Sequence, residues 1–78
     1  MDYKLYAATY CPYCKKVIDF MEKEGIDKVD VLFVDKDDEA KKALLEGSGG
    51  KQVPCLNFGD EWMLESDDII AYMKENLN

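Results

Sequence analysis

The motif Cys-Pro-Tyr-Cys at residues 11–14 constrains this chain more than any other stretch. It places two thiols three positions apart, between an apolar run with strand character at residues 3–8 and a run with helical spacing at residues 12–24. Pro12 suits the first position of a helix, where its missing N–H would have no partner anyway. A Cys-x-x-Cys pair at a strand-to-helix turn predicts a redox-active dithiol.

The two cysteines of this motif are expected to have different roles. Cys11 falls at or just before the helix N-terminus, where unpaired backbone N–H groups and the positive end of the helix dipole favour a thiolate. Lys15 and Lys16 lie one turn further on and would add positive charge. Cys14 lies one turn deeper, on the packed side. We therefore expect Cys11 to attack a substrate disulfide and Cys14 to attack the resulting mixed disulfide, which releases the product.

The counts of cysteine and histidine limit the alternatives to redox chemistry. The 78 residues contain three cysteines and no histidine, whereas a structural zinc site needs four such ligands. An odd number of cysteines also argues against a disulfide-stapled secreted scaffold. A zinc half-site or two unrelated cysteines remain as alternatives, and the strand-to-helix setting favours a dithiol with no metal.

Charge and apolar patterning narrow the classes of partner. The formal net charge of −7 disfavours nucleic acids and anionic membranes. No apolar run approaches the roughly 20 residues that span a bilayer, and no basic segment followed by an apolar one resembles a signal peptide. We expect one domain over residues 1–78, monomeric and cytoplasmic.

The hydrophobic pattern predicts seven elements in the order β-α-β-α-β-β-α. Strands are expected at residues 3–8, 29–34, 53–58 and 61–64, and helices at residues 12–24, 37–46 and 66–77. Asp37 and Ser66 are the expected N-caps of the later helices, Gly25 ends the first, and a break is expected at Gly47. The second strand has the composition of a buried parallel strand. A parallel βαβ unit followed by a hairpin predicts an α/β, thioredoxin-like fold, a four-stranded mixed sheet flanked by three helices.

A proline opens the third expected strand. If the Val53-Pro54 bond were cis, the N–H and C=O of Val53 would lie outside the sheet ladder, free to pair with an extended peptide. An ordinary trans proline at an edge strand is the alternative. Only about 5–6% of X–Pro bonds are cis in folded proteins, so these residues alone favour trans.

Three motifs at these separations resemble a dithiol glutaredoxin over essentially the whole chain: CPYC at residues 11–14, Gln-Val-Pro at residues 52–54 and Ser-Asp-Asp at residues 66–68. That family reduces protein disulfides and removes glutathione from proteins, with glutathione as co-substrate. The resemblance implies that Cys11 is the nucleophile and Cys14 the resolving thiol. The implied partners are glutathione and disulfide-containing or glutathionylated proteins.

The resemblance also implies a glutathione site. Pro54 would be the cis proline, Val53 would pair its backbone with the cysteinyl part of glutathione, and Tyr13 would flank the groove. A helix N-terminus suits the γ-glutamyl carboxylate, and an aspartate suits the neighbouring ammonium. The residues that would hold this γ-glutamyl end are Ser66, Asp67 and Asp68.

Three positions depart from the family pattern. Ala8 stands where most glutaredoxins have a lysine, so Lys51, with Lys15 as a further substitute, would have to hold the glycine carboxylate of glutathione. Glu65 follows Leu64 where the family has two glycines; with the serine after it, Glu65 is similar to the Glu-Ser pair that holds the γ-glutamyl group in glutathione transferases. Cys55 follows the proline. Its interpretations are a buried apolar filler, a regulatory or dimer-forming thiol, or a metal or cluster ligand.

The sequence thus predicts a glutathione-dependent thiol–disulfide oxidoreductase, and two alternatives remain open. The first is a redoxin reduced by a flavoprotein reductase, which the missing lysine at Ala8 suggests. The second is a carrier of an iron–sulfur cluster held between two subunits by Cys11 and glutathione. Pro12 disfavours this carrier, because a rigid turn of this kind is not typical of cluster-binding members of the family.

Overall fold

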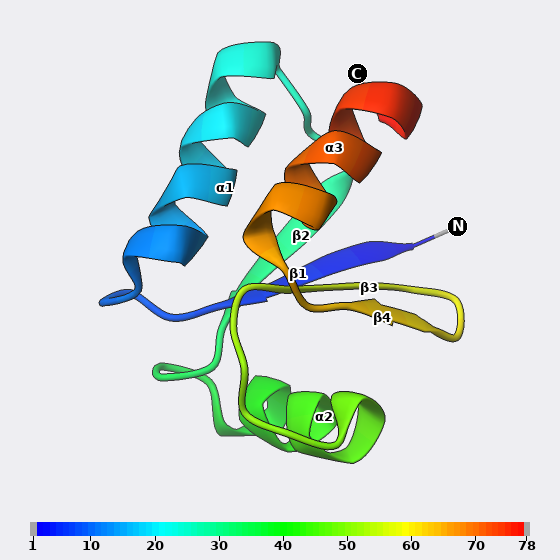
Figure 1. Cartoon of the computed structure of the whole chain (residues 1–78). Helices are drawn as coiled ribbons and strands as arrows, with labels where there is room; N and C mark the ends of the chain where they lie inside the picture. Colours follow the sequence, from blue (N-terminus) through cyan, green and yellow to red (C-terminus); the bar gives the residue numbers. More distant parts are fainter. Residues whose placement is uncertain (1, 78) are drawn as a thin grey trace.

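The computed structural model describes residues 2–77 and contains the seven elements in the predicted order. The strands are β1 (Tyr3–Ala7), β2 (Val29–Phe33), β3 (Cys55–Phe58) and β4 (Glu61–Met63); the helices are α1 (Pro12–Glu24), α2 (Asp38–Ser48) and α3 (Ser66–Asn76). The sheet order is β2-β1-β3-β4, with β1 parallel to β2 and both other pairs antiparallel. Figure 1 shows α1 and α3 on one face of the sheet and α2 on the other. The predicted thioredoxin-like fold is confirmed.

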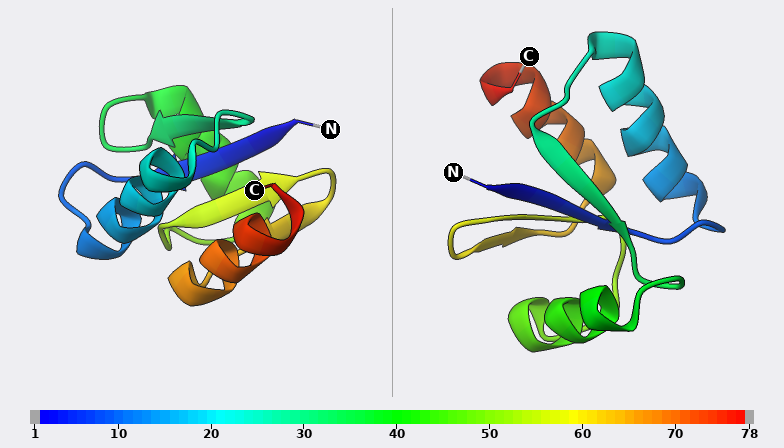
Figure 2. Two further views of the ribbon diagram at one scale, coloured as in Figure 1. Left: turned by 90° about the horizontal axis from the view of Figure 1, so that it is seen from above. Right: turned by 180° about the vertical axis from the view of Figure 1, so that it is seen from behind.

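Alternation along the two central strands builds a core on each face of the sheet. Leu5 of β1 and Leu56 of β3 are paired in register and belong to the core beneath α1 and α3. Tyr6 and Cys55, the next pair, belong to the core beneath α2, together with Leu44. Successive side chains of a strand point to opposite faces, so β1 and β3 hold both helix layers in place. The view from behind in Figure 2 shows the same two layers.

The helix ends follow the sequence signals in α1 and at the start of α2. Pro12 is the first residue of α1, and Gly25 ends that helix in the left-handed conformation with φ of 67°. Asp37 caps α2, because its Oδ1 accepts hydrogen bonds from the N–H groups of Glu39 and Ala40 at 3.0 and 3.3 Å. None of the helices within residues 2–77 has the length and apolar character needed to cross a membrane.

The strand predictions need correction at their ends. Strands β1, β2 and β4 each stop one residue earlier than expected. Strand β3 ends at Phe58 as predicted, but it begins at Cys55 rather than Val53 because the Val53-Pro54 turn precedes the ladder. The expectation of a buried second strand is wrong beyond Val29. Because β2 lies at the edge of the sheet, its remaining residues are half-buried or exposed.

The predicted helix break at Gly47 is wrong. Helix α2 continues through Gly47 to Ser48, whose Oγ donates to the Leu44 carbonyl at 2.7 Å, and it ends at Gly49 with φ of 79°. The glycine at position 47 serves packing instead. A Cβ added there would lie 1.9 Å from Cζ2 of Trp62, whose indole stacks on Tyr6 with ring centroids 5.7 Å apart.

We predict that Gly47→Ala destabilises the protein although it improves helix propensity. The propensity gain is about 1 kcal/mol, whereas overpacking costs about 1–3 kcal/mol, so the free energy of unfolding should fall by about 1 kcal/mol. Urea denaturation measures this change. Gly50→Ala is the matched control, because a Cβ at Gly50 meets nothing within 4 Å. A Gly47→Ala variant more stable than the parent would contradict the packing role, and Trp62→Phe should relieve the clash in the double variant.

Candidate active site

Cys11 caps the N-terminus of α1 with its own sulfur. Its backbone is extended, with φ of −90° and ψ of 116°, and its Sγ accepts a hydrogen bond from the Cys14 N–H at 3.3 Å. On its other side the same sulfur lies 3.9 Å from the Val53 carbonyl oxygen. Cys11 is half-exposed, and its sulfur accepts a hydrogen bond from one helix N–H group, so the sulfur is both accessible and oriented for nucleophilic attack.

Cys14 is in a different environment. Its side chain is fully buried, and this burial is the main cause that raises the pKa of its thiol to about 12. The hydrogen bond with Cys11 and the charges of Cys11 and Asp35 act in the same direction, and a backbone hydrogen bond with Ala8 acts in the opposite one. Burial disfavours the charged form of a thiol. The pair therefore consists of one accessible sulfur and one protected thiol, the asymmetry that the sequence suggested.

A contact that the sequence reasoning missed fixes the turn before the dithiol. The Asp35 carboxylate accepts hydrogen bonds from the Thr9 N–H, at 3.2 and 3.3 Å to its two oxygens, and from the Thr9 hydroxyl. The Thr9 hydroxyl is the main cause that lowers the pKa of Asp35. Ala7 pairs with Phe33 in the parallel ladder, so the residues two positions beyond each strand face one another. Only that register could have revealed the contact.

The loop before β3 places a backbone edge beside Cys11. The Val53-Pro54 bond is cis, as the family resemblance implied and against the general frequency of trans proline. Val53 precedes β3, and among residues 2–77 no hydrogen bond found outside the helices and strands uses its N–H. The Gln52 side chain donates to the Leu64 carbonyl at 3.1 Å and reaches Glu65 Oε1 at 3.5 Å. Gln52, to which the sequence gave no role of its own, thus ties this loop to the start of α3.

A groove of about 590 Å³ runs along this edge to the N-terminus of α3. It brings together seven of the eight residues assigned to glutathione from the sequence, and Gln52 and Leu64 complete its lining. Tyr13 projects from α1 at its border and is 64% exposed. Assignment of these residues to glutathione stays a prediction. The seven are Tyr13, Val53, Pro54, Glu65, Ser66, Asp67 and Asp68.

The N-terminus of α3 leaves its backbone donors free at this groove. Ser66 is the first helical residue rather than the cap, which corrects the sequence prediction by one position; Glu65 is the cap and makes no side-chain cap hydrogen bond. The first intrahelical bond runs from Ile69 N–H to the Glu65 carbonyl, at 2.9 Å. The N–H groups of residues 66–68 therefore have no helical acceptor, unlike those that Asp37 caps in α2.

The groove combines these donors with acidic side chains. Asp67 and Asp68 line it, and Asp67 Oδ1 pairs with Lys16 Nζ at 2.6 Å, which links α3 to α1. Free helix N–H groups attract a carboxylate, and aspartates attract an ammonium. A ligand that carries an ammonium and a carboxylate on the same carbon, as a free α-amino acid group does, matches this arrangement.

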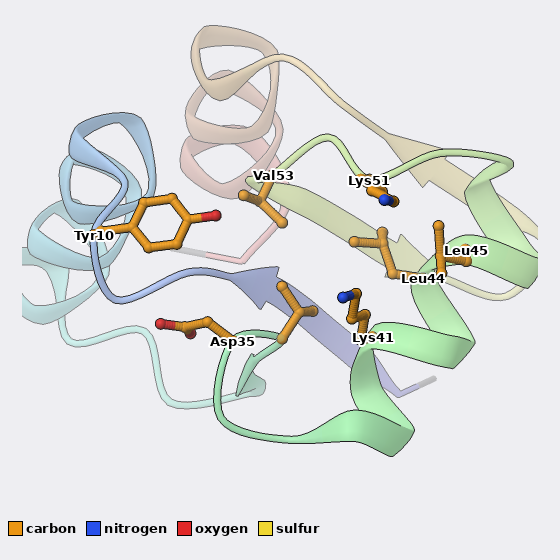
Figure 3. A pocket seen from close by; sticks show the side chains of 8 residues that line it. Tyr10, Asp35, Lys41, Leu44, Leu45, Lys51 and Val53 are labelled. Atoms are coloured by element: carbon orange, nitrogen blue, oxygen red, sulfur yellow. The ribbon is translucent and has the colours of Figure 1, made fainter.

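Lys51 lies outside the groove. It lines a smaller pocket of about 170 Å³ on the other side of Val53, together with Tyr10 and Lys41 among others (Figure 3). Lys15, the other suggested substitute for the missing lysine, pairs with Asp19 at 2.7 Å. The sequence thus placed Lys51 together with the groove residues, whereas in the structure Val53 lies between Lys51 and the groove.

Cys55 is fully buried, in register with Tyr6 beneath α2. Burial raises the pKa of its thiol to about 11. This environment agrees with the interpretation of Cys55 as an apolar filler of the core. No group of three or more cysteine, aspartate or glutamate side chains within residues 2–77 is placed to hold a metal ion.

Comparisons with known proteins agree with this geometry. The model of the glutaredoxin family matches residues 4–63. An uncharacterized glutaredoxin-like 8.6 kDa protein in the rubredoxin operon of Clostridium pasteurianum is 38% identical over 77 residues, 96% of this chain and 91% of that protein. A mutant of the thioredoxin-like protein BC3987 superposes with a TM-score of 0.78 at 24% identity, over 97% of this chain and 99% of that one. The buckwheat glutaredoxin–glutathione complex superposes with a TM-score of 0.70 at 22% identity, over 95% and 69%.

The difference between the three thiols predicts selective alkylation of the reduced protein. At pH 8 iodoacetamide should modify Cys11 alone, because the thiolate is the reactive form and the raised pKa values, about 12 for Cys14 and about 11 for Cys55, keep both as thiols. Raising the pH towards these pKa values should make Cys14 and Cys55 reactive as well, because a larger fraction of each thiol is then ionised. Peptide mass mapping locates the label, and urea-unfolded protein, labelled at all three sites, is the control. Labelling of Cys14 as fast as Cys11 at pH 8 would contradict this environment.

Proposed function

Because this chain belongs to the glutaredoxin family, whose dithiol motif makes it a thiol–disulfide redox protein, we propose that it is a glutathione-dependent oxidoreductase. It reduces protein disulfides and removes glutathione from proteins, in the cytoplasm. The observation that carries this proposal is the groove beside Cys11, which has the free N–H of Val53 along one wall and the free N–H groups of α3 at its end.

Each part of glutathione has a matching group. Its γ-glutamyl end is an α-amino acid, so its carboxylate fits the N–H groups at residues 66–68 and its ammonium fits Asp67 and Asp68. The peptide around its cysteine pairs with the N–H and C=O of Val53, as a strand pairs with a sheet edge. The sulfur then meets Cys11, which lies 3.9 Å from the Val53 carbonyl oxygen. The solved buckwheat complex shows that this fold accommodates glutathione in that protein.

The removal of glutathione from a protein needs Cys11 alone. The Cys11 thiolate attacks the glutathione sulfur of the mixed disulfide, so that a bond between Cys11 and glutathione forms and the protein leaves as a thiol after taking up a proton. A second glutathione thiolate then attacks the same glutathione sulfur. Oxidised glutathione leaves, and the Cys11 thiolate is restored.

The reduction of a protein disulfide uses both cysteines. Cys11 attacks one sulfur of the substrate, and Cys14 then loses its proton and attacks Cys11, which releases the reduced substrate and leaves a Cys11–Cys14 disulfide for two glutathione molecules to reduce. The charge and hydrogen bond of Cys11 contribute to the high pKa of Cys14. Once Cys11 is bonded to a substrate, these two contributions are gone. The Cys14 pKa therefore falls at the step that needs its thiolate.

A flavoprotein reductase is a second candidate for the electron donor. Ala8 is almost completely buried and offers no cation where glutaredoxins have a lysine, which favours a redoxin supplied by a flavoprotein reductase. In the glutathione proposal Lys51 holds the glycine carboxylate, from the far side of Val53. Turnover with glutathione supports the first donor, and reduction by a flavoprotein reductase without detectable glutathione binding supports the second.

We predict that Cys11→Ser and Cys14→Ser separate the two reactions. In an assay that couples glutathione oxidation to reduction of a small glutathione mixed disulfide, Cys11→Ser should fall to the uncatalysed rate because the nucleophile is lost. Cys14→Ser should retain most of this activity and lose the reduction of protein disulfides, which needs a resolving thiol. Absence of turnover by the folded parent protein would refute glutathione dependence. Equal loss in both variants would refute the one-cysteine route.

We predict that Ser66→Pro weakens glutathione binding while the helix remains. Proline suits the first position of a helix, and Glu65 is already extended, with φ of −93° and ψ of 131°, as a residue before proline must be. The change removes one N–H donor to a carboxylate, worth about 1.5–3 kcal/mol, so KM for glutathione should rise at least about tenfold.

Two variants control for other effects of this change. Ser66→Ala keeps the N–H and should leave KM near the parent value. Asp38→Pro makes the same replacement at the first position of α2, away from the groove, and tests for a general loss of stability. An unchanged KM in folded Ser66→Pro would contradict the assignment of this helix N-terminus.

A further inference from the structure

A second hollow begins at the reacting sulfur and is separate from the groove. Its volume is about 300 Å³, and Cys11 itself lines it, whereas Val53 and Pro54 line the groove. Because the sulfur of Cys11 also lies 3.9 Å from the Val53 carbonyl oxygen, Cys11 lies between the two hollows. This hollow, which we call the α1 pocket, is formed by the turn after β1, the first turns of α1 and the end of β2. Its lining residues are Ala8, Thr9, Cys11, Lys15, Ile18, Asp19 and Phe33.

The wall of the α1 pocket is largely apolar. Ala8 is almost completely buried, whereas Ile18 and Phe33 are half-buried, so part of each of these two larger side chains stays in contact with water. An apolar cavity of about 150 Å³ accommodates benzene, so the α1 pocket has room for an aliphatic chain of several carbons. Transfer of such a chain from water to an apolar wall is favourable.

The polar side chains of the lining already have partners. Lys15 Nζ pairs with Asp19 Oδ2 at 2.7 Å, and the Thr9 hydroxyl donates to the Asp35 carboxylate. An anionic ligand would have to compete with Asp19 for Lys15, so the α1 pocket favours an uncharged occupant. The groove differs in this respect, because its free helix N–H groups and aspartates suit charged groups.

The backbone beside the α1 pocket is already used in hydrogen bonds. The Cys11 N–H donates to the Ala8 carbonyl at 3.3 Å, and the Val34 N–H donates to the Ala7 carbonyl at 2.8 Å. The N–H of Val53, by contrast, lies at the groove on the other side of Cys11. A peptide that pairs with Val53 is therefore held at the groove. The α1 pocket suits a small thiol whose alkyl chain begins at the sulfur.

We propose that the α1 pocket is a second substrate site, which binds the apolar half of a mixed disulfide between glutathione and a small uncharged thiol. The proposal rests on the proposed function, because it assumes that Cys11 attacks glutathione mixed disulfides. The Cys11 thiolate attacks the sulfur of the apolar half, the bond between the two substrate sulfurs breaks, and glutathione leaves as a thiolate. Cys14 then attacks Cys11. The apolar thiolate leaves and takes up a proton, and a Cys11–Cys14 disulfide remains.

The choice between the two substrate sulfurs can be measured in the Cys14→Ser variant, in which the adduct on Cys11 accumulates. Mixed disulfides of glutathione with ethanethiol, butanethiol and hexanethiol differ only in the length of the alkyl chain, so the intrinsic reactivity of their sulfurs is the same. Peptide mass mapping of samples quenched early with acid gives the ratio of alkanethiol adduct to glutathione adduct. This ratio should rise about tenfold from ethanethiol to butanethiol, since each buried CH₂ group contributes up to about fourfold.

Urea-unfolded protein is the control for this series, because its ratio should not depend on chain length. A ratio that is equally independent of chain length in the folded protein would overturn the proposal. The series needs no change in the pocket lining, so it decides the question even if a variant of the lining does not fold.

Variants of Ile18 in the Cys14→Ser background test the wall itself. Ile18→Gln should lower the butanethiol ratio about fourfold, as expected when one CH₂ group loses its apolar contact. Ile18→Met, which has a similar length and stays apolar, should keep the ratio. Ile70→Gln makes the same replacement at a half-buried residue of α3 outside the pocket lining and should also keep it. Equal ratios in folded Ile18→Gln and Ile70→Gln would overturn the proposal.

A mixed disulfide of butanethiol with mercaptoethanol separates this proposal from the proposed function. It contains no glutathione, yet Ile18→Gln should lower the ratio of its butanethiol adduct to its mercaptoethanol adduct in the same way. If the parent protein does not turn over glutathione mixed disulfides and this effect persists, the proposed function is refuted and the α1 pocket is supported. Glutathione turnover by the parent protein without this effect of Ile18→Gln would overturn the α1 pocket alone.

Discussion

The pairing of β1 on both of its sides is the constraint on which the active site depends. Its parallel pairing with β2 brings the residues that follow the two strands together, so that Asp35 holds Thr9 in the turn before the dithiol. Its antiparallel pairing with β3 brings the Val53-Pro54 turn beside Cys11. Three segments far apart in the sequence thus meet at one end of the central strand. A shift of one residue in either ladder would turn side chains to the opposite face and separate them.

Burial and helix capping then give groups of the same type different chemical properties. Cys11 and Cys14 differ because one caps a helix at the surface, while the other lies in the core with its pKa raised to about 12. The helices differ in the same way: α2 is capped by Asp37, whereas α3 leaves its first N–H groups free at the groove. On a strongly acidic chain, those free N–H groups suit the anionic part of a substrate.

Local signals in the sequence were sufficient for the order of elements, the dithiol and the capping by Asp37, since each depends on neighbouring residues. Errors arose where the deciding contact is distant. Gly47 reads as a helix break, but it lies inside α2, where Trp62 packs so close that a Cβ would clash with it. Lys51 is close in sequence to the residues of the groove, yet Val53 separates it from them. The edge position of β2 and the contact between Thr9 and Asp35 follow from strand order and register, which hydrophobic periodicity does not encode.

In the proposed complex, glutathione extends from Cys11 to the N-terminus of α3. This placement can be tested by comparing the amide chemical shifts of the Cys14→Ser variant, with Cys11 held in a mixed disulfide with glutathione, with those of the same variant in its reduced form. Large shifts are expected at the N–H groups of Val53, Ser66 and Asp67, in addition to those around Cys11. Shifts confined to the first turn of α1, with residues 66–68 unchanged, would contradict it.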